Sequence, residues 1–189
     1  MSVMLVFLVT VSYAQETEQK EKTVDDIQKW TFVDEVGYGF PGEAMSLRFI
    51  FGASYSVNKN LYLRAQLGYI CGFYSKYQNG STLETDMGFI TLPLEVGYKI
   101  VTENSFPWGI IPFAGIGFNL GVSAKAEYNK EEYELDGVKG KMGVEARAGL
   151  RLVLGGFVVT GSYYFPLNSK QENFFGEDAY PEISIGFGF

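Results

Sequence analysis

Apolar and polar side chains alternate with a period of two residues through most of the chain, from Trp30 onward. The last eleven residues show the alternation most plainly, with the apolar positions Ile183, Ile185, Phe187 and Phe189. A period of two is that of the β-strand, because successive side chains of a strand point to opposite faces. Eight such segments can be counted, near residues 30–40, 44–56, 60–74, 86–101, 109–124, 140–154, 156–167 and 179–189. The pattern therefore predicts an all-β chain.

The connections between the segments alternate in length. Residues 57–60, 102–108 and 155–156 form short connections, whereas 75–85, 125–139 and 168–178 form long polar ones, and 41–43 is the exception. Short turns on one side and long loops on the other are typical of outer-membrane barrels. Each segment reaches the roughly 9 to 11 residues that a tilted strand needs to cross a bilayer. We predict an eight-stranded antiparallel up-and-down transmembrane β-barrel, closed by pairing of residues 30–40 with 179–189.

Every charge in the middle of a segment lies on the face that is otherwise rich in Gly and Ser. These charges are Arg48, Arg64, Glu95, Lys99, Glu145, Arg147, Arg151 and Glu182, with Glu35 on the first segment. Turning an arginine toward lipid would cost about 2 to 4 kcal/mol near the bilayer midplane. The charges are therefore expected in the lumen, which an eight-stranded barrel fills with its own side chains. The prediction is a salt-bridge network that blocks passage, and the alternative is a narrow channel for small solutes.

Aromatic residues fall toward the two ends of the segments. Tyr55, Tyr98, Trp108 and Phe157 lie near the short connections, and Phe73, Tyr163 and Phe165 lie toward the long ones. This placement is typical of the aromatic girdles at the two membrane interfaces. Two prolines, Pro93 and Pro112, lie well inside segments, where a missing N–H breaks a ladder bond. We expect them at a bulge or at the rim of the barrel.

The N-terminal residues differ from the rest of the chain. Residues 1–14 read as a secretory signal peptide, with an apolar core and the small-x-small site Ser12-Tyr13-Ala14. Residues 15–29 are nearly all charged or amide residues, which predicts a mobile periplasmic lead-in before a barrel domain at 30–189. The single cysteine, Cys71, is expected on the apolar face as a small hydrophobe. Together these features predict export to the outer membrane of a Gram-negative bacterium, with lipid as the surrounding partner.

Composition argues against several classes of function. The net charge of −7 argues against a nucleic-acid partner, because phosphate binding needs a basic patch and none is visible in the sequence. The chain contains no His, which most barrel hydrolases use as general base, so an outer-membrane enzyme is a remote alternative. No Cys/His cluster suits a transition metal, and no cofactor is expected.

The connection 125–139 is acidic and aromatic. Its candidate interaction residues are Tyr128, Glu131, Glu132, Tyr133, Glu134 and Asp136. Such a loop suits an extracellular protein or glycan, or a divalent cation, although the spacing does not match a calcium loop. A solvated loop without any partner explains the same residues.

Two neighbouring segments carry a family resemblance. The stretches Phe89–Lys99 (FITLPLEVGYK) and Ile111–Gly121 (IPFAGIGFNLG) resemble paired central strands of the PorT-like outer membrane β-barrel proteins of Bacteroidetes-type bacteria, which share the architecture of small OmpA- and OmpX-type barrels. The similarity covers roughly Gly37 to Phe189. The resemblance implies that the terminal strand, with Phe187 and Phe189, is the signal for the barrel-assembly machinery. It implies no activity, so a structural, interaction or adhesion role through the loops is the expected function.

Overall fold

The computed structural model describes residues 30–41, 44–78, 81–101, 108–128, 131–135, 138–167 and 179–188. The signal peptide and lead-in expected at 1–29, and the residues Asp136 and Phe189, lie outside the described residues. Within the described ranges the structure contains no helix long and apolar enough to cross a membrane.

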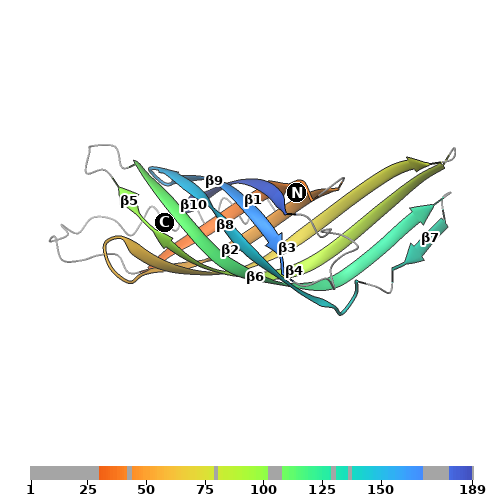
Figure 1. The fold of residues 1–189 in the computed structure, drawn as a ribbon, viewed down its shortest axis with the longest axis horizontal. Coiled ribbons are helices and arrows are strands. Elements are labelled where there is room, and N and C mark those ends of the chain that lie inside the picture. Colours follow the sequence, from red (N-terminus) through yellow and green to blue (C-terminus); the bar gives the residue numbers. More distant parts are fainter. Residues whose placement is uncertain are drawn as a thin grey trace, which may run out of the picture.

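Strands make up nearly all of the described chain (Figure 1). They are β1 (Trp30–Gly39), β2 (Met45–Ser56), β3 (Leu61–Gln78), β4 (Ser81–Tyr98), β5 (Ile100–Val101), β6 (Trp108–Tyr128), β7 (Glu131–Glu134), β8 (Met142–Leu154), β9 (Phe157–Pro166) and β10 (Tyr180–Gly188). Neighbours pair antiparallel in the order β1-β2-β3-β4-β6-β8-β9-β10. The two-residue β5 pairs only with β6, and β7 pairs with β6 outside this ring.

Pairing of the first and last barrel strands closes the ring. Val36 of β1 lies opposite Ile185 of β10, in a ladder that runs from Val33↔Gly188 to Gly39↔Glu182. Closure removes the free sheet edges that an open eight-stranded sheet would expose. The predicted all-β, eight-stranded up-and-down barrel is confirmed.

The two faces of the strands are those that the alternation predicts, except that Asp34 of β1 lies opposite Phe51 and Phe187 on the outer wall rather than in the lumen. In β3, for example, Arg64 and Gln66 are buried inside the barrel, whereas Leu63 and Leu67 are exposed on its outer wall. Six of the seven aromatic residues predicted for the girdles are likewise exposed outward, and the seventh, Tyr55, is half-buried; the six are Tyr98, Trp108, Phe157, Phe73, Tyr163 and Phe165. The outer wall is therefore the apolar surface.

The strand ends differ from the prediction at one end of the barrel. Residues 75–85 and 125–139 were expected to form long irregular connections, yet β3, β4 and β6 run through most of them, and β7 adds a short strand. Beyond the Met45↔Phe73 pair, β3 has no β2 partner, and the β6–β8 ladder ends at Leu120↔Met142. The strands continue because they pair with one another rather than with the rest of the barrel. The prediction was wrong here, because pairing among β3, β4 and β6 extends the strands through residues whose composition is typical of loops.

The β2–β3 and β8–β9 turns lie at the opposite end. The β8–β9 turn uses Gly155 with a φ of 63°, a conformation that side chains with a Cβ rarely adopt. The β2–β3 turn is held by Asn58, whose side-chain oxygen accepts hydrogen bonds from the backbone N–H of Asn60 and Leu61. We call this the turn end of the barrel, and the other the hairpin end.

Both prolines lie beside an interruption of one of their two ladders. Pro93 pairs with Gly117 of β6, while the β3–β4 ladder is interrupted opposite it, at Gln66 and Leu67. The expectation of a bulge or rim was wrong for Pro93, because an interrupted ladder already accommodates a residue without an N–H. The bulge lies elsewhere, where Gly88↔Ser123 is followed by Phe89↔Gly121.

The expectation was also wrong for Pro112, which lies inside β6 and pairs with Leu150 of β8. The ladder of β6 with β4 and β5 is interrupted beside it, between Gly97↔Phe113 and Ile100↔Ile110.

Candidate functional site

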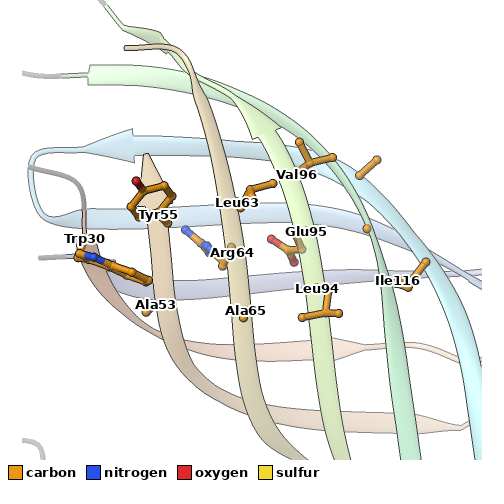
Figure 2. A pocket seen from close by; sticks show the side chains of 12 residues that line it. Trp30, Ala53, Tyr55, Leu63, Arg64, Ala65, Leu94, Glu95, Val96 and Ile116 are labelled. Carbon is orange, nitrogen blue, oxygen red and sulfur yellow. The ribbon is translucent and has the colours of Figure 1, made fainter. Parts of the chain in front are cut away.

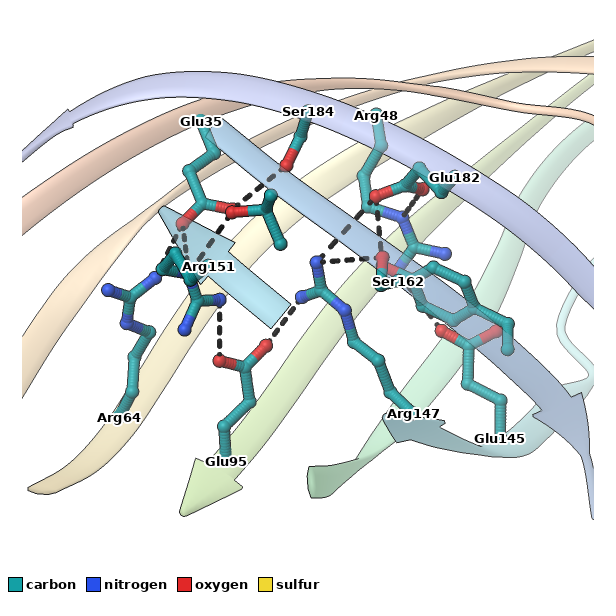
Figure 3. Close-up of polar contacts among 12 residues, drawn as sticks. Glu35, Arg48, Arg64, Glu95, Glu145, Arg147, Arg151, Ser162, Glu182 and Ser184 are labelled. Atoms are coloured by element: carbon teal, nitrogen blue, oxygen red, sulfur yellow. Dashed lines mark hydrogen bonds and ion pairs between the residues drawn. The ribbon is translucent and has the colours of Figure 1, made fainter. Parts of the chain in front are cut away.

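Four glutamates and four arginines fill the middle of the lumen as one connected network (Figure 3). On one side of it, Arg48 lies 3.0 Å from Glu145 Oε1 and, through Nε, 2.9 Å from Glu182 Oε2. The latter is an ion pair without the alignment of a hydrogen bond. Arg147 lies 3.7 Å from the other oxygen of Glu182.

The other side of the network centres on Glu95 and Glu35. Glu95 binds Arg147 at 2.5 Å through one oxygen and Arg151 at 2.9 Å through the other. Arg151 continues to Glu35 at 3.3 Å, and Glu35 also pairs with Arg64 at 2.5 Å. Each of these side chains is at most 5% exposed. Such burial is tolerated only where each charge is paired.

Hydroxyl groups complete the network. Tyr180 donates to Glu145 and Tyr164 donates to Glu182 at 2.9 Å, while Arg151 donates to the Tyr62 hydroxyl at 2.6 Å. The Tyr164 and Tyr180 rings stack 5.1 Å apart, and Arg48 lies 4.2 Å above the Tyr164 ring. The sequence analysis did not single out Tyr164 and Tyr180. Tyr164 lies two residues after the buried Ser162, and Tyr180 lies two residues before the buried Glu182. The alternation therefore places both tyrosines on the lumen face and could have identified them.

Each glutamate of the network has a glycine directly opposite on a neighbouring strand. The pairs are Glu35↔Gly186, Glu95↔Gly115, Glu145↔Gly117 and Glu182↔Gly39. A Cβ on Gly117 would lie 2.9 Å from Glu145 Oε1. The glycines of the polar face therefore make room for the carboxylates to lie along the wall.

Lys99, the remaining residue predicted for the network, lies apart from it. Its ammonium donates to Ser56 Oγ at 3.2 Å and lies 5.6 Å from the centre of the Tyr62 ring. Among the residues that the structure describes, no carboxylate lies within ion-pair distance of Lys99.

The lumen is closed by apolar side chains on the hairpin side of the network and hollowed on the turn side. Ile70, Met87, Phe89 and Ala124 form a buried apolar cluster next to Tyr164 and Tyr180. On the turn side a cavity of about 200 Å³ is lined by Tyr62, Arg64 and Lys99. The network and the apolar cluster thus stand between the cavity and the hairpin end.

A second hollow lies on the outer wall (Figure 2). Its lining includes the small residues Ala53 of β2, Ala65 of β3 and Ala114 of β6, and the larger residues Trp30 and Leu63. Arg64 and Glu95 belong to the same wall, but their side chains point to the lumen. The hollow is apolar and belongs to the surface that faces lipid.

The hairpin end carries the predicted interaction residues on a projecting sheet. Its strands follow the order β3-β4-β6-β7 and extend beyond the other strands, at the right of Figure 1. Glu131, Glu132, Tyr133 and Glu134 form β7, all exposed, and Tyr128 ends β6. The Tyr133 hydroxyl donates to Glu131 at 2.6 Å, which raises the pKa of Tyr133.

One face of the projecting sheet carries a row of carboxylates. Glu84 lies opposite Glu127, which lies opposite Glu132. Lys125 pairs with Glu132 at 3.1 Å, and both side chains are exposed. Like charges directly opposite on adjacent strands destabilise a sheet. Across the described part of the chain, no group of three or more His, Cys, Asp or Glu side chains is arranged to hold a metal ion.

The model of the outer membrane protein beta-barrel domain family matches residues 13–171 of the chain. No curated protein matches the chain. The PorT-like resemblance is finer than this match and stays a prediction, as does the signal peptide.

Solved structures of similar fold include small barrels of several bacteria. The N-terminal barrel domain of Pseudomonas aeruginosa OprF is 12% identical, with 86% of this chain and 98% of that one covered and a TM-score of 0.48. The attachment invasion locus protein Ail of Yersinia pestis is 12% identical, with 85% and 96% covered and a TM-score of 0.47. The outer membrane enzyme PagL is 13% identical, with 84% and 98% covered and a TM-score of 0.40.

Proposed function

The chain belongs to the outer membrane protein beta-barrel domain family, and we propose that its barrel is a closed anchor that presents the projecting sheet β3-β4-β6-β7 to a basic partner protein at the cell surface. The observation that carries the proposal is the asymmetry of the barrel. Three barrel strands continue past the rim at the hairpin end, where β7 joins them, although the lumen below them is filled by side chains. In barrels of this kind the longer hairpins lie outside the cell and the short turns in the periplasm.

The chemistry of the projecting sheet supports a basic partner. The row Glu84, Glu127 and Glu132 is held together against its own repulsion, with Lys125 as a cation beside it. A partner with Lys or Arg residues would relieve that repulsion, and complementary charge also speeds association.

Two other functions are less well supported. A narrow solute channel requires a continuous water path, which the ion pairs and the apolar cluster interrupt among the described residues. An enzyme with a histidine base is not available to a chain that contains no His.

Site-directed labelling tests the orientation on which the proposal depends. In a Cys71→Ala background, Tyr133→Cys is expected to react with a membrane-impermeant maleimide on intact cells. Lys59→Cys, in the β2–β3 turn, is expected to react only after lysis. Labelling of position 59 but not 133 on intact cells would contradict the proposal.

Binding to a synthetic oligolysine peptide tests the charge. The refolded protein is expected to bind the peptide with an affinity that falls as salt rises, because the charges are exposed. The triple substitution Glu84→Gln, Glu127→Gln and Glu132→Gln should weaken that binding and flatten its salt dependence, while an uncharged peptide serves as the control. Equal binding by the triple variant would show that the acidic row is a solvated surface.

A further inference from the structure

The cavity at the turn end of the lumen is built by all eight barrel strands or their ends. Its polar lining includes Thr31, Ser54, Tyr62, Arg64 and Lys99, and its apolar lining includes Val33, Ile111, Val153 and Val158. At about 200 Å³ it has room for roughly six or seven water-sized units of ~30 Å³ each. It lies at the opposite end from the projecting sheet, so it is independent of the proposed function.

The cavity carries the one lumen charge that the network leaves over. Arg48, Arg64, Arg147 and Arg151 are matched by Glu35, Glu95, Glu145 and Glu182, and Lys99 is the additional cation. No carboxylate of the described residues lines the cavity. Arg64 also lines the cavity, but Glu35 matches its charge, so the positive potential at the cavity comes from Lys99.

The hydrogen-bonding groups at the cavity have donors to spare. The Lys99 ammonium has three N–H donors and gives one to Ser56. The Tyr62 hydroxyl accepts a hydrogen bond from Arg151, so its own O–H points in another direction and can donate. An anionic oxygen near Lys99 would satisfy these donors and neutralise the additional charge.

The apolar part of the lining selects the rest of the ligand. Val33, Ile111 and Val158 are buried and apolar, so they cannot satisfy a second charged group. We propose that the cavity is a binding site for a small monocarboxylate with a short alkyl chain, the carboxylate on Lys99 and the chain against Val33, Ile111 and Val158. The site is a dead end rather than a path, because the ion-pair network and the apolar cluster lie behind it.

Tryptophan fluorescence provides the test, because Trp108, whose side chain is exposed on the outer wall, directly precedes Gly109 of the cavity lining and belongs to its rim. The chain has two tryptophans, so Trp30→Phe leaves Trp108 as the only reporter. The full chain carrying this substitution, refolded in detergent micelles, is titrated with sodium butyrate against sodium chloride at constant ionic strength. Butyrate is expected to change the Trp108 emission saturably, acetate to bind more weakly because its chain is shorter, and chloride to have no saturable effect.

Substitutions at two lysines of the same end separate the site from bulk charge. Lys99→Gln should weaken butyrate binding by about tenfold or more, as expected for loss of a charge-assisted hydrogen bond. Lys99→Arg should retain binding. Lys59→Gln removes the same charge from the exposed β2–β3 turn and should leave the affinity unchanged.

Two outcomes would overturn the proposal. The first is a butyrate response no larger than the chloride response in the protein with both lysines, a measurement that requires no cavity variant to fold. The second is butyrate binding that Lys99→Gln and Lys59→Gln weaken equally, which would mean non-specific attraction to the turn end.

Discussion

At the scale of single residues, the lumen network depends on complete pairing. Arg151 shows this most clearly, because it contacts Glu35, Glu95, Tyr62 and Thr160 and is fully buried. Removing one partner of a buried network leaves the others unpaired in a site of low dielectric constant, where an unpaired charge is costly.

We therefore expect Arg151→Met to lower the free energy of unfolding by about 3 to 5 kcal/mol. Unfolding in urea from detergent micelles, followed by the gel shift between folded and heat-denatured barrel, measures it. Lys125→Met is the matched control, because the exposed Lys125–Glu132 pair contributes less than about 1 kcal/mol. An equal decrease in the free energy of unfolding for the two variants would show that burial does not increase the contribution of these charges to stability.

Glycine at position 37 gives a second residue-scale prediction. A Cβ there would lie 2.6 Å from Glu182 Oε1, so Gly37→Val must move Glu182 away from Arg48 and Arg147. A lower urea midpoint than wild type is expected. Gly161→Val is the control, because no atom lies within 4 Å of its added Cβ on the outer wall. The idea fails if Gly161→Val is the more damaging of the two.

At the scale of the element, each strand must present its apolar face to lipid and its polar face to the lumen. β8 carries both, with Leu150 outside at 59% exposure and Arg151 inside. A slip of one residue would exchange the two faces, so the faces fix the register.

Leu150→Arg is accordingly expected to destabilise the barrel by about 2 to 4 kcal/mol if it lies near the bilayer midplane. The measurement is unfolding from phospholipid vesicles. Leu150→Phe, of the same apolar character, should change the stability little. A tolerated arginine at this position would mean that the outer wall does not face lipid.

The strand that closes the barrel gives another element-scale prediction. Phe187 packs on Phe157 at 4.5 Å between ring centroids, and β10 pairs with both β1 and β9. The resemblance assigns an assembly signal to this strand, so deletion of Phe189 should reduce the folded fraction in outer membranes by several fold. Phe189→Tyr, which keeps an aromatic residue at this position, should leave the folded fraction at the wild-type level. Normal assembly of the deletion variant would remove the terminal aromatic from the assembly signal.

At the scale of the whole molecule, the lumen consists of successive layers along the barrel axis. From the turn end they are the cavity, the ion-pair network and the apolar cluster below the projecting sheet. The layers act in series, so the least permeable one decides whether ions pass.

We expect the refolded protein to show no stepwise conductance in planar bilayers at neutral pH. Glu95→Gln with Arg151→Met, which removes charges but not the apolar cluster, should also stay silent. A porin reconstituted in the same bilayers is the control for insertion. Regular conductance steps from the wild-type chain would instead favour the channel.

Much of this architecture is written locally in the sequence. The period-two pattern predicts the strands, their number and both faces, because side-chain alternation depends only on neighbouring residues. The same pattern places Arg48, Arg64, Glu95 and Glu182 in the lumen, where the structure has them. It could not extend β3 and β6 beyond the rim, because that extension depends on pairing between the two hairpins.

The choice of partners inside the lumen is decided by the tertiary structure alone. Arg48 and Glu145 meet across 97 residues and Arg151 and Glu95 across 56, through strands that the barrel's stagger brings to one level. That stagger also sets each glutamate opposite a glycine and leaves Lys99 beside a cavity rather than a carboxylate. The alternation of side chains along the chain determines which of them enter the lumen. The register of the closed barrel determines which of them meet, because residues so far apart in sequence are brought together only by the closed sheet.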